Sequence, residues 1–417
     1  MVLLFGDGIA ATLLGDVRCA KAFPFVLLCL ALTGVENIFK SLFIGLEQMQ
    51  YTATSEVGEQ LIRIFSVGIL LYRYQGEDYG TIAMLIFAGM VVSEVFSALF
   101  LTRLFRRSMA HTSLAAPLDR ATARQFFFIA LPLSASALIG NIISSAGSVL
   151  LPQRLMVAGL TYEQALSALG VISGMAMPLL LLPVALVSSV CTALLPAITA
   201  AQAVGSSERV RGLIGRAIST VGLIGVPATA VLVPLAPRLS ELFFRQPLTA
   251  EYVTLLGAVA IISYYQMTSG SLLNALGLQH INVVTAVSAE LCQLFLLYRW
   301  CASPRLGIYG YLLAMLLTDT IAFTVNLCVL RCRSGFACKP LRRFGVPALC
   351  GAALFLWTRI FFRVFQDVCR TEAAALMLTV LGAGVLYVLV LRLMGIRLLR
   401  YLSRRIERPQ LPHPCMW

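Results

Sequence analysis

The chain has 417 residues, of which 59% are hydrophobic and only 12% are charged, and its mean hydropathy is +0.87. Soluble domains carry about 25% charged residues, so this composition is typical of a polytopic membrane protein and excludes a soluble enzyme. The formal net charge is +13. Because the basic residues are dispersed among the apolar runs instead of forming one basic face, nucleic-acid binding is excluded as the main function.

Apolar runs of the length that crosses a bilayer, about 20 residues of helix, recur along the whole chain. They predict an all-α polytopic membrane protein with about 11 transmembrane helices. The expected spans are 22–45, 55–72, 80–102, 126–150, 166–198, 217–236, 252–275, 281–298, 307–330, 344–362 and 373–395.

The arginines and lysines between the spans predict an orientation. If every second connection is cytoplasmic, the larger share lies on that side, with clusters at 103–124, 331–343 and 392–408. The positive-inside rule then places the C-terminus in the cytoplasm and the entry to the first span outside. An odd number of spans with an external start and no recognisable signal peptide leads us to expect that the beginning is missing.

The basic tail follows the last span. In IRLLRYLSRRIER, from Ile396, apolar residues share one helical face and arginines surround the other. This pattern predicts an amphipathic helix lying on an anionic leaflet. A solvated charged end is the alternative.

Neither cysteine nor histidine forms a recognisable chemical site. The 11 cysteines are odd in number and mostly lie inside apolar runs, where cysteine behaves as a small hydrophobic residue. Cys328, Cys332 and Cys338 cluster without a histidine to complete zinc spacing. The three histidines, at 111, 280 and 413, are dispersed. We therefore expect no enzyme activity, no metal and no cofactor, coupling to H⁺ or Na⁺ excepted.

Two stretches about 231 residues apart share an outline. SLFIGLEQMQYTATSEVGEQ (from Ser41) and SLLNALGLQHINVVTAVSAE (from Ser271) each end one span and begin the next. With one residue of slip, five positions match: Ser41, Leu42, Gln48, Thr54 and Glu59 correspond to Ser271, Leu272, Gln279, Thr285 and Glu290. This predicts a duplication, since transporters are commonly built from repeated helical bundles.

Three segments carry a resemblance to a known family. They are LLPQRLMVAGLTYEQALSALGVISGMAMPLLLLPVALVSSVCTALLPAI (150–198), the start GDVRCAKAFPFVLL, and SEVGEQLIRI (55–64). The chain resembles the stage V sporulation protein B branch of the polysaccharide flippase family, in the multidrug/oligosaccharidyl-lipid/polysaccharide exporter superfamily.

This resemblance implies two pseudo-symmetric six-helix lobes plus two C-terminal helices, with the first two and a half helices missing. The chain would then be N-terminally truncated. The implied organisation is an incomplete N-lobe at 1–107, a cytoplasmic inter-lobe loop at 108–124, a C-lobe at 125–332, two additional helices at 333–395 and a basic cytoplasmic tail at 396–417.

The resemblance also implies a flippase for a lipid-linked oligosaccharide, polysaccharide or cell-wall precursor, working by alternating access. The expected surroundings are a bacterial plasma membrane, with a role in cell wall biogenesis or sporulation, and the expected partner is a polyprenyl-linked saccharide. We expect a monomer. Two alternatives stay open: a cation-coupled exporter of drugs or organic cations, and a non-transporting scaffold in envelope or spore assembly.

Polar residues inside the spans are the candidates for a substrate or ion pathway, because charge in hydrocarbon is costly and normally faces a partner or water. They are Glu36, Asn37, Lys40, Glu56, Glu59, Arg63, Glu94, Asn141, Asn274, Glu290 and Asp319. The pairs Glu36–Lys40 and Glu59–Arg63 have i, i+4 spacing and are expected to meet. The alternative is that these pairs only neutralise each other, with Glu56 and Glu290 at the cytoplasmic interface.

Two further groups of candidates concern substrate capture and motion. Arg154 follows a span on the predicted external side, where it would receive a diphosphate or carboxylate or serve as an interfacial anchor. Gly174, Pro178 and Pro183 lie within one long span. Because proline frees a carbonyl and bends a helix, they are candidate hinges or simply shape the lobe.

Overall fold

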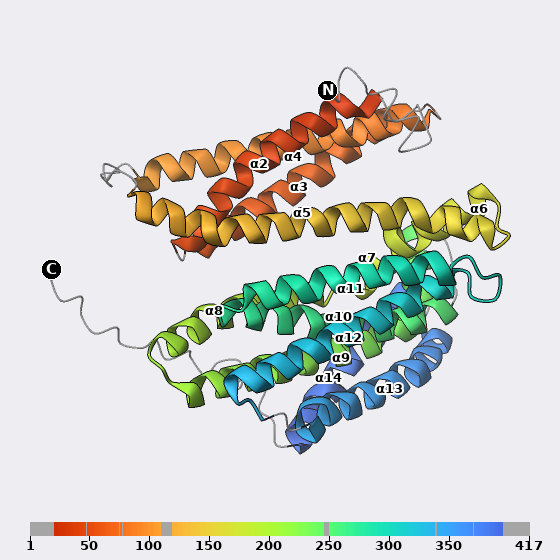
Figure 1. Ribbon diagram of the computed structural model, residues 1–417. Helices are drawn as coiled ribbons and strands as arrows, with labels where there is room; N and C mark the ends of the chain where they lie inside the picture. The colour runs from red at the N-terminus through yellow and green to blue at the C-terminus, as the bar shows by residue number, and fades with distance from the viewer. Residues whose placement is uncertain are drawn as a thin grey trace. The chain divides into compact units, whose positions relative to one another are not determined.

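The computed structural model describes residues 21–46, 48–74, 76, 78–109, 119–245, 250–337, 340–369 and 371–394 (Figure 1). The predicted amphipathic tail at 396–417, the family-like start before residue 21 and most of the predicted inter-lobe loop lie outside these residues. The described part is all-α and contains no strand. It divides into two compact units, Met1–Ala123 and Arg124–Trp417.

Unit 1 is a three-helix bundle of α2 (Phe23–Gly45), α3 (Met49–Arg73) and α4 (Tyr79–Met109). Pro24 lies in the first turn of α2, where its missing N–H costs no helical hydrogen bond. Helix α4 packs against both α2 and α3, whereas α2 and α3 touch each other only slightly. The side chains that α2 and α3 direct inward therefore meet on α4.

A glycine permits the close approach of α3 and α4. A Cβ added at Gly89 of α4 would lie 2.6 Å from Val67 Cγ2 and 2.9 Å from the Val67 backbone nitrogen. No larger residue fits there without moving a backbone, which is the packing that small residues provide between membrane helices.

Unit 2 holds the remaining described helices. They are α5 (Arg120–Val157), α6 (Tyr162–Gly170), α7 (Met177–Leu180), α8 (Val184–Ala203), α9 (Ser207–Phe244), α10 (Ala250–Ala275), α11 (Gln279–Trp300), α12 (Ile308–Ser334), α13 (Val346–Val368) and α14 (Glu372–Leu393), with π-helical turns η3 (Val171–Ala176) and η4 (Leu341–Gly345). Helix α9 packs against α8, α10 and α13, and α14 packs mainly on α13.

The predicted span 166–198 is a broken helix. Helix α6, η3, α7 and α8 follow one another, with a turn at 181–183 that ends at Pro183, the N-cap of α8. Proline lacks the N–H that would continue the helix. The hydroxyl of Tyr264 on α10 donates a 2.6 Å hydrogen bond to the carbonyl of Leu180 just before the break. The break is thus held in place from a neighbouring helix.

The apolar runs match the helices. Within the described residues, eight helices or helix series are long and apolar enough to cross a membrane. Helices α3, α5 and α10, with 25, 38 and 26 residues, also exceed the length of about 20 residues that a span requires. Every predicted span thus falls on a described helix, in a multi-pass membrane protein that is surrounded by a lipid bilayer.

The two units share a local architecture. Helix α12 packs against both α10 and α11, which barely touch, as α4 does against α2 and α3. A backbone hydrogen bond closes each of the turns before α3 and α11. The Gln48 N–H donates to the Phe43 carbonyl at 2.8 Å, and the Leu278 N–H donates to the Leu273 carbonyl at 2.9 Å. These two turns therefore match at a spacing of 230 residues, as Ser41–Ser271 and Leu42–Leu272 do, whereas the sequence repeat pairs Gln48 with Gln279 at 231.

Candidate functional site

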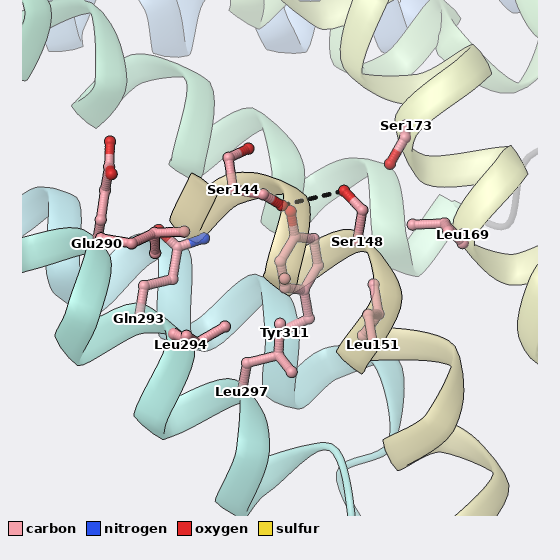
Figure 2. Close-up of a pocket in the computed structure, with 12 residues that line it drawn as sticks. Ser144, Ser148, Leu151, Leu169, Ser173, Glu290, Gln293, Leu294, Leu297 and Tyr311 are labelled. Carbon is pink, nitrogen blue, oxygen red and sulfur yellow. Dashed lines mark hydrogen bonds between the residues drawn. The ribbon is translucent and has the colours of Figure 1, made fainter. Parts of the chain in front are cut away.

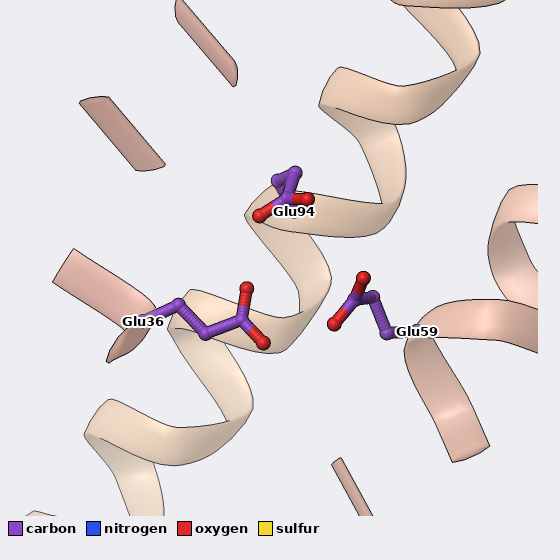
Figure 3. Close-up of side chains that lie close together, drawn as sticks. All are labelled: Glu36, Glu59 and Glu94. Carbon is purple, nitrogen blue, oxygen red and sulfur yellow. The ribbon is translucent and has the colours of Figure 1, made fainter. Parts of the chain in front are cut away.

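Unit 1 contains a buried cluster of charged residues. Glu36 on α2, Glu59 on α3 and Glu94 on α4 are at most 5% exposed. Their carboxylates point toward one another from three helices (Figure 3), and one oxygen of each lies within 4.8 Å of the others. The three acids therefore meet where α4 packs between α2 and α3. We call Glu36, Lys40, Glu59, Arg63 and Glu94 the charged cluster.

Two basic residues bridge these acids. The Lys40 ammonium lies 2.6 Å from Glu36 and 3.5 Å from Glu59. Arg63 pairs with Glu59 on its own helix and with Glu94 at 2.9 Å. Both ion pairs expected from i, i+4 spacing are present, and each base also reaches a second acid.

Small hydroxyl side chains complete the cluster. Ser97 donates to Glu36 at 2.6 Å, Thr33 donates to Glu94 at 2.9 Å, and Arg63 Nε donates to Ser93 at 3.3 Å. Ser55 of α3 and Ser97 of α4 share a 2.7 Å hydrogen bond. The sequence analysis did not single out these residues. The signal available for α4 was the pattern SEVFS, which places Ser93 and Ser97 at i, i+4 spacing beside Glu94.

The charges in the cluster do not balance. Three carboxylates face two bases, so one negative charge is left over when all five groups are ionised. Glu56, which is exposed, adds a further carboxylate 3.5 Å from Lys40. An uncompensated charge inside a membrane protein is costly, so the cluster suits an additional proton or monovalent cation. Asn37 is exposed on α2, outside the cluster.

In unit 2 the polar candidates do not form one cluster. Asp319 of α12 accepts a hydrogen bond from Ser263 of α10. Asn274 accepts one from Asn282 at 3.1 Å, across the turn between α10 and α11. Asn141 is exposed on α5. Asn326, a further polar residue of α12, is buried and donates to Ser269 at 3.2 Å.

Glu290 lies in the middle of its helix. It is 11 residues beyond Gln279, the first residue of the 22-residue α11. Its match to Glu59 across the repeat indicates the same depth, since Glu59 lies 10 residues into α3. The buried oxygen Oε2 of Glu290 has no hydrogen-bond partner among the described residues. Its carboxylate faces Gly140 of α5, where an added Cβ would lie 3.0 Å away.

Arg154 lies at the end of α5, with its guanidinium carbon 3.2 Å from the centroid of the Tyr298 ring on α11. Arginine stacks in this way on aromatic faces and keeps its hydrogen-bond donors free for other partners. Of the hinge candidates, Gly174 lies in η3 with open space around it, Pro178 is in the first turn of α7, and Pro183 caps α8.

Comparison with known proteins shows what the chain is similar to. Residues 1–202 match the family model described as polysaccharide biosynthesis protein. Stage V sporulation protein B of Bacillus subtilis (strain 168) is 24% identical over 322 residues, which cover 76% of this chain and 62% of that protein. Sporulation protein YkvU of the same organism is 21% identical over 282 residues, which cover 67% of this chain and 63% of that protein. The chain thus spans less than two thirds of the length of these relatives.

Solved structures show the same fold. The outward-facing conformation of a multidrug resistance MATE family transporter of the MOP superfamily matches with a TM-score of 0.63 and 16% identity, over 80% of this chain and 74% of that chain. The inward-facing conformation of such a transporter matches with a TM-score of 0.62 and 15% identity, over 80% and 76%. Residues 1–202 are therefore similar to the polysaccharide biosynthesis protein family, and the chain has the fold of these solved MATE family transporters.

Proposed function

We propose that the protein is a flippase that moves a lipid-linked oligosaccharide, polysaccharide or cell-wall precursor across the membrane by alternating access, and that it is a transporter and not an enzyme. The observation that carries the proposal is the charged cluster, five ionisable side chains on three membrane-spanning helices. Intramembrane ionisable residues that face a bundle interior are typical of substrate and ion pathways. The family model, described as polysaccharide biosynthesis protein, supports the substrate class.

Alternating access is supported by the relatives of the same fold, which are known in outward-facing and inward-facing conformations. The broken helix from α6 to α8 and the prolines of α9 offer places where unit 2 can bend. We place the protein in a bacterial plasma membrane, as a monomer with a cytoplasmic C-terminus. Its biological setting would be cell wall biogenesis or sporulation, as the printed names of the relatives suggest.

A coupling ion follows from the excess negative charge of the cluster. Binding of one H⁺ or Na⁺ among Glu36, Glu59 and Glu94 would neutralise it. Because each base contacts two acids, a change in the charge of one carboxylate would alter contacts on both other helices. Ion binding would thereby favour one packing of α2, α3 and α4 over another.

The same excess of acid also suits an organic cation, so a cation-coupled multidrug exporter is the second candidate. The test is reconstitution of the purified protein into liposomes. The flippase predicts translocation of a fluorescently labelled polyprenyl-diphosphate sugar at a rate above that of protein-free liposomes. Translocation of ethidium without any of the labelled lipid would instead support the multidrug exporter, and translocation of neither would support a scaffold.

A further inference from the structure

Unit 2 contains a second polar site. A cavity of about 170 Å³ opens between α5, η3, α11 and α12. Polar side chains from all four elements line it (Figure 2): Ser144, Ser148, Ser173, Glu290, Gln293 and Tyr311. The remaining lining residues are apolar except for Gly147, with Leu151, Leu294 and Leu297 among them. The cavity thus has a polar side and an apolar side.

The chemistry of the lining selects against an anion. None of the twelve described residues around the cavity is basic, and one of them, Glu290, is acidic. Gln293 and the hydroxyls both donate and accept hydrogen bonds, whereas an ionised Glu290 only accepts. The Oε2 atom of Glu290 is buried and faces Gly140, so the hydrogen bonds to a ligand fall to Gln293 and the hydroxyls.

The size and shape of the cavity select against a bare metal ion. A volume of 170 Å³ is five to six times the share of a water molecule in the liquid, which is about 30 Å³. A dehydrated hard cation needs oxygen ligands that converge at about 2.3–2.6 Å, but the lining oxygens come from four elements around a much larger space. A ring with hydroxyls on its edge and C–H groups on its face matches both the polar and the leucine-lined side.

We propose that this cavity binds one neutral sugar ring, a pyranose of the saccharide that the protein transports. Gln293 and Ser148 exchange hydrogen bonds with neighbouring ring hydroxyls, and the leucines contact the C–H face. The assignment rests on the proposed saccharide substrate, but it concerns a site in unit 2 that is separate from the charged cluster.

The test is saturation-transfer NMR on the detergent-solubilised protein, with glucose and N-acetylglucosamine as probes. We expect a saturable signal for at least one sugar, and at least a tenfold weaker affinity in Gln293→Leu. Gln293→Asn, which keeps the amide but shortens its reach, is a second variant should Gln293→Leu not fold. The matched control is Cys292→Ala, at the exposed neighbour on α11 that does not line the cavity, and its affinity should equal that of the parent.

Absence of a sugar signal in the folded parent, or equal affinity in both Gln293 variants and the parent, overturns the assignment. So does ²³Na⁺ binding that depends on Glu290 when no sugar binds. The liposome assay keeps this failure apart from failure of the proposed function. Flipping without sugar binding at Gln293 refutes only the cavity assignment, whereas sugar binding without flipping supports the cavity and refutes the flippase.

Discussion

The Lys40 ammonium lies 2.6 Å from the Glu36 carboxylate, one turn away on α2, in a site where the glutamate is only 2% exposed. Because the pair is buried, removing one of its charges is not equivalent to removing both. Removing one partner leaves a buried charge without compensation, which costs far more than an ion pair at the surface.

Lys40→Met is therefore expected to lower the free energy of unfolding by about 3–5 kcal/mol. The double variant Lys40→Met/Glu36→Gln should regain much of this loss, because it removes both charges. Reversible unfolding in detergent, followed by circular dichroism, measures both. If the single and the double variants were equally destabilised, the charges of Lys40 and Glu36 would not compensate each other.

The close contact of α3 and α4 predicts a glycine effect. Gly89→Ala should destabilise unit 1 by about 1–3 kcal/mol, the typical cost of overpacking, because its Cβ would meet Val67 at 2.6 Å. Gly68→Ala on α3, with nothing within 4 Å, is the matched control and should be neutral or slightly stabilising. Thermal unfolding midpoints of the two variants decide the matter, and a Gly89→Ala protein as stable as the control would contradict the packing.

The hydrogen bond from Tyr264 to the broken helix predicts that loss of the tyrosine hydroxyl lowers stability. Tyr264→Phe removes the donor to the Leu180 carbonyl and leaves a buried acceptor unsatisfied, which should cost about 1–3 kcal/mol. Tyr162→Phe, at an exposed tyrosine of α6, controls for the chemical change. Hydrogen exchange should rise around residues 177–187 in Tyr264→Phe alone. Unchanged exchange there would mean that the break does not depend on Tyr264.

A pH effect is expected at the edge of unit 1, outside the spans. The pKa of the Asp78 carboxyl is lowered because the Thr81 hydroxyl and the Lys21 ammonium donate hydrogen bonds to it. A lowered pKa in the folded state contributes stability above the unfolded pKa of about 3.9, and this contribution is lost as the pH falls through the folded pKa.

Asp78→Asn should therefore be less stable than the parent at pH 7, and the difference should shrink below about pH 4. The side chains of Lys21 and Asp78 are 58% and 41% exposed, so solvent screens the effect. Unfolding midpoints across pH measure it, with Asp367→Asn, at an exposed aspartate of α13, as the control. A difference that stays constant down to pH 2 would rule out a lowered Asp78 pKa.

The sequence predicted the fold well because a membrane span can be recognised from the composition and length of an apolar run. The i, i+4 pairs were equally accessible, since helical geometry alone brings Glu36 to Lys40 and Glu59 to Arg63. The sequence did not predict that these two pairs meet Glu94 in one cluster, because this depends on how α4 packs between α2 and α3. The serines that contact the charged cluster, the hydrogen bond from Tyr264 to Leu180 and the cavity around Gln293 likewise join helices that are distant in the sequence.

The most direct test of the central claim is the rate at which reconstituted protein flips a fluorescent polyprenyl-diphosphate sugar, in the parent and in Lys40→Met/Glu36→Gln at matched folded amounts. The account predicts translocation by the parent and at least a tenfold slower rate in the double variant, because the charged cluster would have lost its bridge between α2 and α3. Parent liposomes no faster than protein-free ones, or a folded double variant as fast as the parent, would contradict it.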